Sequence, residues 1–100
     1  MKVSNIIQMY NLTDNFKEIS YLVKVEIYDC NKLVNRLYYY VERICEGLYE
    51  VKFNSIADEK TLKYFFKLKT VHFDDFILAK EYAVKKMKKL KQYLENAKNN

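Results

Sequence analysis

The chain has 100 residues, of which half are apolar and 16% aromatic, so it is long enough for one folded domain and too apolar for a disordered segment. Its single glycine, Gly47, and its lack of proline exclude a glycine-rich phosphate-binding loop and the dinucleotide-binding fingerprint. The net charge of +5 is unevenly distributed: residues 1–60 hold eight basic and nine acidic side chains, whereas residues 61–100 hold ten lysines and four acidic ones. This segregation indicates an interaction surface in the last forty residues.

The first twenty residues have no clear period. Ser4 to Tyr10 is compatible with a short helix, and Thr13-Asp14-Asn15 is typical of a turn. From Tyr21 the sequence alternates between apolar and polar residues, which predicts a half-buried strand. One face of this strand holds Tyr21, Val23, Val25 and Ile27, and the other holds Lys24, Glu26 and Tyr28.

The same alternation continues in residues 33–44 and 48–53, which predicts two further strands. Turn-forming residues at 29–32 and 45–47 precede them. In the first of these two strands Leu37, Tyr39 and Val41 face one way, and Arg36, Tyr38, Tyr40 and Glu42 face the other. In the second, one face holds Tyr49, Val51 and Phe53, and the other holds Glu50 and Lys52.

A fourth strand is predicted from Thr61 to Val71, after a turn at residues 55–60. Leu62, Tyr64, Phe66 and Leu68 would face inward, and Lys63, Phe65, Lys67 and Lys69 outward. A helix over residues 55–68, capped by Ser55, is the competing prediction. The strict alternation and the aromatic content favour the strand.

The last predicted element is a long amphipathic helix over residues 74–98. Asp74 is a plausible N-cap, and the preceding Phe73 could pack against Leu78. Apolar residues then recur at spacings of three and four, in a stripe roughly 80° wide. The stripe consists of Phe76, Ala79, Ala83, Met87, Leu90, Leu94 and Ala97.

These elements predict a single α+β domain. Short connections favour a four-stranded antiparallel meander over residues 21–71, with the helix packed on its inner face and the other face in solvent. Four antiparallel strands followed by one helix resemble, in element order alone, the single-strand-binding coactivator, Pur-type and Whirly-type domains. That resemblance covers roughly residues 21–98 and implies a nucleic-acid-binding sheet, although no sequence motif of those families is present.

The outer face of the predicted sheet is the first candidate binding site. It interleaves aromatic rings with cations, and such a face can hold a single strand by stacking bases on the rings while the cations contact phosphates. The candidate residues are Arg36, Tyr38, Tyr40, Lys63, Phe65, Lys67 and Lys69. The alternative is an ordinary solvated face, in which Glu26, Glu42 and Glu50 neutralise the cations.

The densest charge cluster is the helical run from Lys85 to Lys91. Its five lysines spread around most of the non-apolar circumference, and lysines late in a helix also complement its dipole. A solvated helix surface therefore competes with phosphate binding as the explanation. Tyr82, Lys89 and Tyr93 share one side of the helix at spacings of seven and four.

Catalytic and metal-binding patterns are weak. Cys30 and Cys45 fall in turns at opposite ends of a predicted strand, too far apart for a disulfide, so free thiols are expected. His72, the sole histidine, lies beside Asp74 and Asp75, and local hydrogen bonding is a sufficient role for it. We expect no enzymatic activity, no cofactor and no metal.

The sequence thus favours a small basic binding module for single-stranded nucleic acid. The abundance of Lys, Tyr, Asn and Ile reflects A/T-rich codons and resembles the small reading frames of archaeal viruses, phages and plasmids from A/T-rich hosts. That resemblance suggests the alternative of an interaction factor that binds a host protein. Without a secretory or membrane-spanning segment, an intracellular location is expected, in the host cytoplasm if the chain is viral. A homodimer is possible in either case.

Overall fold

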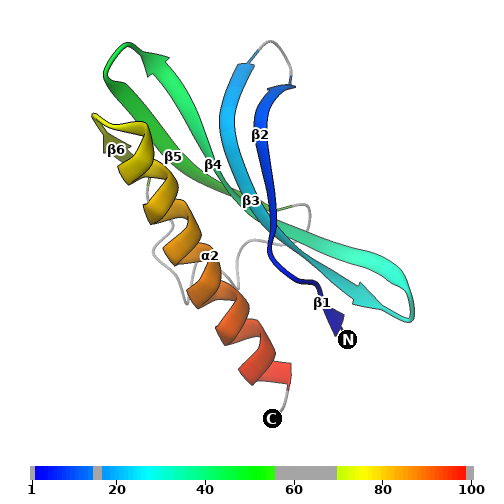
Figure 1. Cartoon of the computed structure of the whole chain (residues 1–100). Coiled ribbons are helices and arrows are strands. Elements are labelled where there is room, and N and C mark those ends of the chain that lie inside the picture. Colours follow the sequence, from blue (N-terminus) through cyan, green and yellow to red (C-terminus); the bar gives the residue numbers. More distant parts are fainter. Residues whose placement is uncertain (1, 15–16, 56–69, 99–100) are drawn as a thin grey trace.

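The computed structural model describes residues 2–14, 17–55 and 70–98, with the side chains of residues 13, 14, 17, 97 and 98 left aside. In these ranges an antiparallel sheet packs against one long helix (Figure 1). The elements, in chain order, are β1 (Lys2–Val3), β2 (Ile7–Asp14), β3 (Lys17–Asp29), β4 (Lys32–Cys45), β5 (Leu48–Ser55), β6 (Val71–Phe73) and α2 (Phe76–Lys98). The α+β class predicted from the sequence is confirmed.

Among the described residues the sheet has six strands, whereas four were predicted for the chain. Its order is β1-β3-β4-β5-β6, and β2 pairs with the same strand, β3, that β1 pairs with. The β3-β4-β5 meander confirms the first three predicted strands, with Val23 opposite Tyr39 and Val41 opposite Val51. The predicted strand over residues 61–71 lies outside the described residues, apart from Thr70, which is not in a strand, and Val71, which begins β6.

The N-terminal segment is a strand, and the predicted short helix over residues 4–10 is wrong. Ile7 to Asp14 pairs along β3, so Thr13 and Asp14, predicted to form a turn, belong to a ladder opposite Glu18 and Lys17. The cause is a tertiary contact. A helix of seven residues is only marginally stable by itself, whereas the edge of β3 supplies hydrogen-bond partners for the backbone of this segment.

Ser4 connects β1 to β2 along the edge of β3. Its backbone N–H donates to the Glu26 carbonyl at 2.8 Å, and its hydroxyl oxygen accepts from the Glu26 N–H, also at 2.8 Å. Three residues between Val3 and Ile7 lie opposite two residues of β3, so one residue is extra. This irregularity turns Ile7 to the opposite face of the sheet from Val3.

The turn between β3 and β4 forms where the sequence predicts it. Asp29 pairs with Lys32, and the two central residues have positive φ angles, 50° for Cys30 and 65° for Asn31. Two consecutive positive φ angles define the type I′ turn, whose twist matches that of the flanking strands. Cys30 and Cys45 lie near opposite ends of β4, both exposed and unbridged, in agreement with the predicted free thiols.

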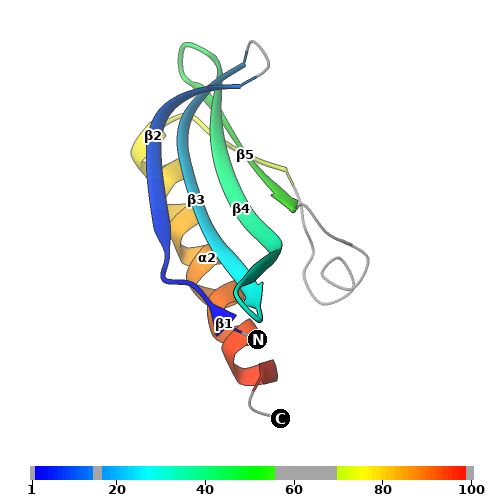
Figure 2. The same cartoon turned by 90° about the vertical axis from the view of Figure 1, so that its right-hand side faces the viewer.

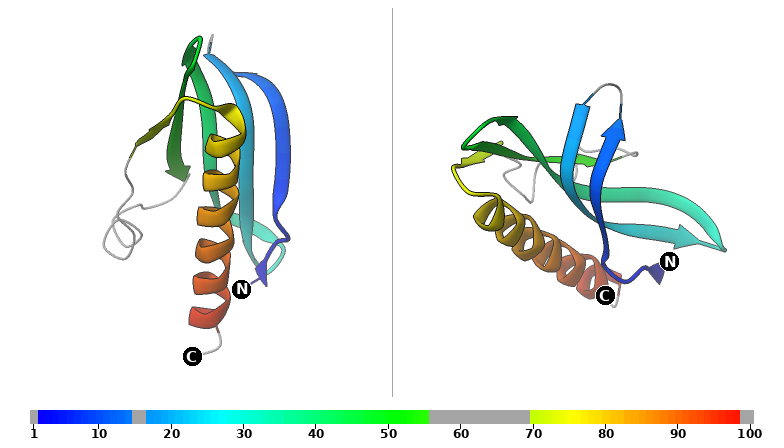
Figure 3. Two further views of the ribbon diagram at one scale, coloured as in Figure 1. Left: turned by 60° about the vertical axis from the view of Figure 1, so that its left-hand side comes forward. Right: turned by 45° about the horizontal axis from the view of Figure 1, so that its top comes forward.

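Helix α2 crosses the inner face of the sheet, as the views in Figures 2 and 3 show. The predicted inward residues of β3 and β4 and the helix stripe meet in one core. Its fully buried members include Tyr21, Val23, Val25, Leu37, Val41, Val51, Ala79, Ala83, Met87 and Leu90. Burial of these side chains is the main stabilising term of the fold.

The start of α2 differs from the prediction by one residue. The Asp75 carboxylate accepts the Ile77 N–H at 3.1 Å, and the Asp75 carbonyl accepts the Ala79 N–H at 3.1 Å, which makes Asp75 the N-cap in place of Asp74. The predicted packing of Phe73 against Leu78 stays a prediction. Leu78 is 47% exposed, and the Phe73 ring packs against Tyr82 with centroids 5.3 Å apart.

Candidate nucleic-acid interface

The predicted site is described only in part. Arg36, Tyr38 and Tyr40 lie on β4 and face away from α2, as predicted, whereas Lys63, Phe65, Lys67 and Lys69 lie outside the described residues. The rings of Tyr38 and Tyr40 are neighbours, with centroids 6.0 Å apart and planes tilted by 43°. Both rings are half-buried, and the Tyr38 hydroxyl accepts a hydrogen bond from the Asn54 amide at 3.0 Å.

The cations around these rings are paired with carboxylates. The guanidinium of Arg36 makes two contacts of 3.1 Å with one Glu26 carboxylate oxygen, and Lys24 lies 4.0 Å from the same oxygen. Lys52 lies between Glu42 at 3.9 Å and Glu50 at 3.2 Å.

Pairing and burial each raise one pKa on this face. The hydrogen bond to Glu50 is the main cause that raises the pKa of Lys52. Burial is the main cause that raises the pKa of Tyr40. His72, opposite Glu50 across the β5–β6 pair, places Nε2 3.4 Å from the Glu50 carboxylate, so its local role is an ion pair when it is protonated.

The described part of the outer face is therefore nearly neutral. Lys24, Arg36 and Lys52 are matched by Glu26, Glu42 and Glu50, which is the solvated-face alternative named above. A phosphate that approached Arg36 or Lys52 would have to compete with a carboxylate already in contact. Tyr38 and Tyr40 offer stacking surface there, but the described cations add little attraction.

Some described cations are not matched in this way: Lys2, Lys32 and Arg43 on the strands, and a group of lysines on helix α2. Tyr82, Lys85, Lys86, Lys89 and Tyr93 fall within an arc of about 100° of the helix at 100° per residue, and we call them the basic-aromatic stripe. Glu81 and Glu95, the two acidic residues of α2, lie outside that arc. Lys85 and Lys89 are exposed, and no carboxylate in the described ranges lies within ion-pair distance of either.

The stripe borders the core along one flank of the helix. The Tyr82 ring packs on Phe73 of β6, and the Lys86 ammonium lies 5.5 Å from the Tyr82 ring centroid. Tyr82 and Tyr93 are both half-buried and therefore partly accessible, and the contact with Phe73 holds the Tyr82 ring in place. A cation beside a fixed ring is the pairing that favours stacked, anionic ligands.

Two of the described helix lysines outside the stripe, Lys80 and Lys91, have other contacts, whereas Lys88 is exposed and has no ion pair with a described carboxylate. The Lys80 ammonium lies over the rings of Tyr10 and Tyr21, 4.9 and 5.4 Å from their centroids, and Lys91 forms an ion pair with Glu95. The sequence revealed that Tyr82, Lys89 and Tyr93 share a side. The sequence analysis missed that this side has no acidic residue. A helical wheel shows it, because Glu81 and Glu95 both fall outside the arc.

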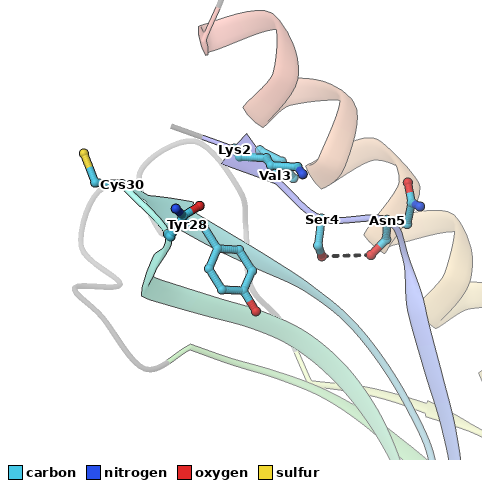
Figure 4. A pocket seen from close by; sticks show the side chains of 7 residues that line it. Lys2, Val3, Ser4, Asn5, Tyr28 and Cys30 are labelled. Atoms are coloured by element: carbon cyan, nitrogen blue, oxygen red, sulfur yellow. Dashed lines mark hydrogen bonds between the residues drawn. The ribbon is translucent and has the colours of Figure 1, made fainter.

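A groove of about 600 Å³ lies between β1 and the β3–β4 turn (Figure 4). It is lined by Lys2, Val3, Ser4, Asn5, Tyr28, Cys30 and Asn31. Its one charged group, Lys2, and its scattered amides and hydroxyls do not form a recognisable catalytic arrangement. Within residues 2–14, 17–55 and 70–98, no group of three or more His, Cys, Asp or Glu side chains is placed to bind a metal.

Comparison with known proteins gives no relative: no family model matches the chain, and no curated protein and no solved structure is significantly similar to it. Among the described helices, none is long and apolar enough to cross a membrane.

Proposed function

We propose that this protein binds single-stranded nucleic acid through the basic-aromatic stripe of α2. The observation that carries the proposal is the difference between two sets of cations. Lys24, Arg36 and Lys52 on the sheet are paired with carboxylates, whereas Lys85 and Lys89 on the helix are exposed and unpaired within the described structure.

In this mechanism the lysines supply affinity and the rings select the single-stranded form. Lys85, Lys86 and Lys89 contact phosphates and release counterions, which makes binding weaker at high salt. Unstacked bases lie on the accessible parts of Tyr82 and Tyr93, where each stacked base contributes about 1–3 kcal/mol. A duplex keeps its bases stacked internally and would gain only the phosphate contacts.

The sheet face remains the second candidate for the same function. Tyr38 and Tyr40 face away from α2. A nucleic acid bound to the stripe therefore lies on the opposite side of the sheet from these two rings. Lys24, Arg36 and Lys52, on the described part of this face, are already paired with carboxylates, so that part offers less electrostatic attraction than the stripe.

A matched pair of variants tests the proposal. Each replaces three helix lysines by glutamine and lowers the net charge equally: Lys85, Lys86 and Lys89 within the stripe, and Lys80, Lys88 and Lys91 outside it. Titration of a fluorescent oligothymidine at fixed salt should show binding at least about tenfold weaker for the stripe variant, and less than about threefold weaker for the control. Equal losses would show that only net charge matters, and no binding by the native chain would refute the proposal.

A further inference from the structure

Strand β2 forms an edge of the sheet, and the sequence does not protect it. Its neighbour is β3 alone, and among the described residues no strand pairs with its other side. Residues 7–13 include no charged residue and no proline, although 31% of the chain is charged. Edge strands in monomeric proteins are usually blocked by lysine, proline or a bulge. Only the positive φ angle of Asn11, 52°, distorts this edge.

An apolar cluster lies beside this edge, on the face away from α2. Met9 pairs with Leu22, which pairs with Tyr40, and Leu12 pairs with Ile19 in the next row. Ile19 reaches this face because the β3–β4 register shifts between Ile19 and Tyr21, which sets Ile19 opposite Glu42. We call Ile7, Met9, Leu12, Ile19 and Leu22 the outer apolar patch.

The outer apolar patch is separate from the main core. Ile19 and Leu22 are each only 9% exposed, yet neither belongs to the cluster that α2 covers. Met9, at the edge, is 37% exposed. Ile7 and Leu12 are half-buried, so the accessible part of the patch lies along β2, at the sheet margin, and no described helix or strand covers that margin.

We infer that a second copy of this chain covers the patch, by antiparallel pairing of the two β2 strands about a two-fold axis. Backbone groups of the two edges would bond directly, and each apolar row would continue into the partner. In such an isologous contact each β2 strand pairs with the β2 strand of the other copy. No β2 edge is then left for a third chain, so assembly stops at the dimer.

Charge favours a second copy over other occupants. Two chains of net charge +5 repel each other, so self-association needs a surface without cations, and the uncharged stretch of β2 provides one. Lys24 bounds the patch at one end and Glu42 at the other. Both charges are paired within the chain, Lys24 with Glu26 and Glu42 with Lys52, so the margin of the patch adds little repulsion between two copies.

The interface leaves the basic-aromatic stripe free. Lys80 is the described helix lysine on the β2 side, and its ammonium is already placed over the rings of Tyr10 and Tyr21. Tyr82 and the stripe lie on the opposite flank, against Phe73 of β6. The inference therefore does not depend on the proposed function.

Light scattering coupled to size-exclusion chromatography over a dilution series tests the dimer. Met9→Lys places a charge on the edge strand and should convert the native dimer to a monomer at all concentrations measured. Leu33→Lys is the matched control, because Leu33 is also a strand residue and is 38% exposed, against 37% for Met9. This control should remain dimeric, and circular dichroism should show the same fold in both variants.

Salt separates this test from that of nucleic-acid binding. Higher salt screens the repulsion between the basic chains and should maintain or strengthen the dimer, whereas it weakens phosphate contacts. A native chain that is monomeric throughout the dilution series would overturn the inference, as would equal dissociation by Met9→Lys and Leu33→Lys. If the Met9→Lys monomer still binds oligothymidine, the two proposals are independent.

Discussion

Tyr39 should make the fold sensitive to alkaline pH. Its side chain lies in the core, 6% exposed, with its ring edge-on to Phe53 at 5.1 Å. Burial, helped by Tyr82, raises the pKa of Tyr39 from 10.0 to about 12. Because the folded-state pKa is the higher one, the stabilisation is fully present below the unfolded-state value and is lost as the pH rises toward the folded-state value.

The size of this effect follows from the shift. Each pKa unit corresponds to about 1.4 kcal/mol, so wild type should lose roughly 1.4 kcal/mol through Tyr39 at about pH 11, and up to about 2.7 kcal/mol at higher pH. Tyr39→Phe removes the ionisable group and retains the ring. Any stability difference between the two proteins at neutral pH serves as the baseline, and the test uses only the part of the difference that changes with pH.

Urea denaturation at a series of pH values measures the difference directly. The free energy of unfolding of Tyr39→Phe should exceed that of wild type by an amount that grows between about pH 10 and pH 12. Lysine titration affects both proteins equally and cancels in the comparison. Identical pH dependence of the two proteins would refute the argument that burial of this hydroxyl opposes its ionisation.

Three further substitutions test the fold. Met87→Ala, at a fully buried helix position, should lower the free energy of unfolding by about 2–5 kcal/mol in urea titrations. Asp75→Ala should cost about 1 kcal/mol by removing the N-cap, and Asp74→Ala less than about 0.5 kcal/mol; the reverse order in thermal melts would contradict the cap assignment. Cys30→Asn should stabilise the hairpin by about 0.5–1 kcal/mol, because asparagine tolerates the positive φ there; a lower melting temperature would count against the type I′ turn.

Much of the core could be predicted from the sequence. Period-two alternation identified Tyr21 to Ile27 and Leu37 to Val41 as inward-facing, and spacings of three and four identified the buried stripe of α2. These patterns are reliable because one face of each element is buried and the other is solvated. Apolar residues therefore recur with the period of the strand or helix that contains them.

The N-terminal strand and the charge pairing could not be predicted in this way. Ile7 to Asp14 carries no clean alternation, because irregularities at Ser4–Ile6 and at Asn11 change which face its residues point to. Whether Arg36 is free or paired depends on cross-strand register, which sets it opposite Glu26. Register describes how two strands align, so it cannot be predicted from the residue pattern of β4 alone.

The salt dependence of single-strand binding tests the central claim most directly. The logarithm of the binding constant should fall linearly with the logarithm of salt concentration, with a slope of about −0.7 for each phosphate contact. Replacing Lys85, Lys86 and Lys89 with glutamine should make that slope shallower by about 2, and the control variant with substitutions outside the stripe should keep the wild-type slope. An unchanged slope in the stripe variant would show that these lysines do not contact phosphate and would contradict the proposed function.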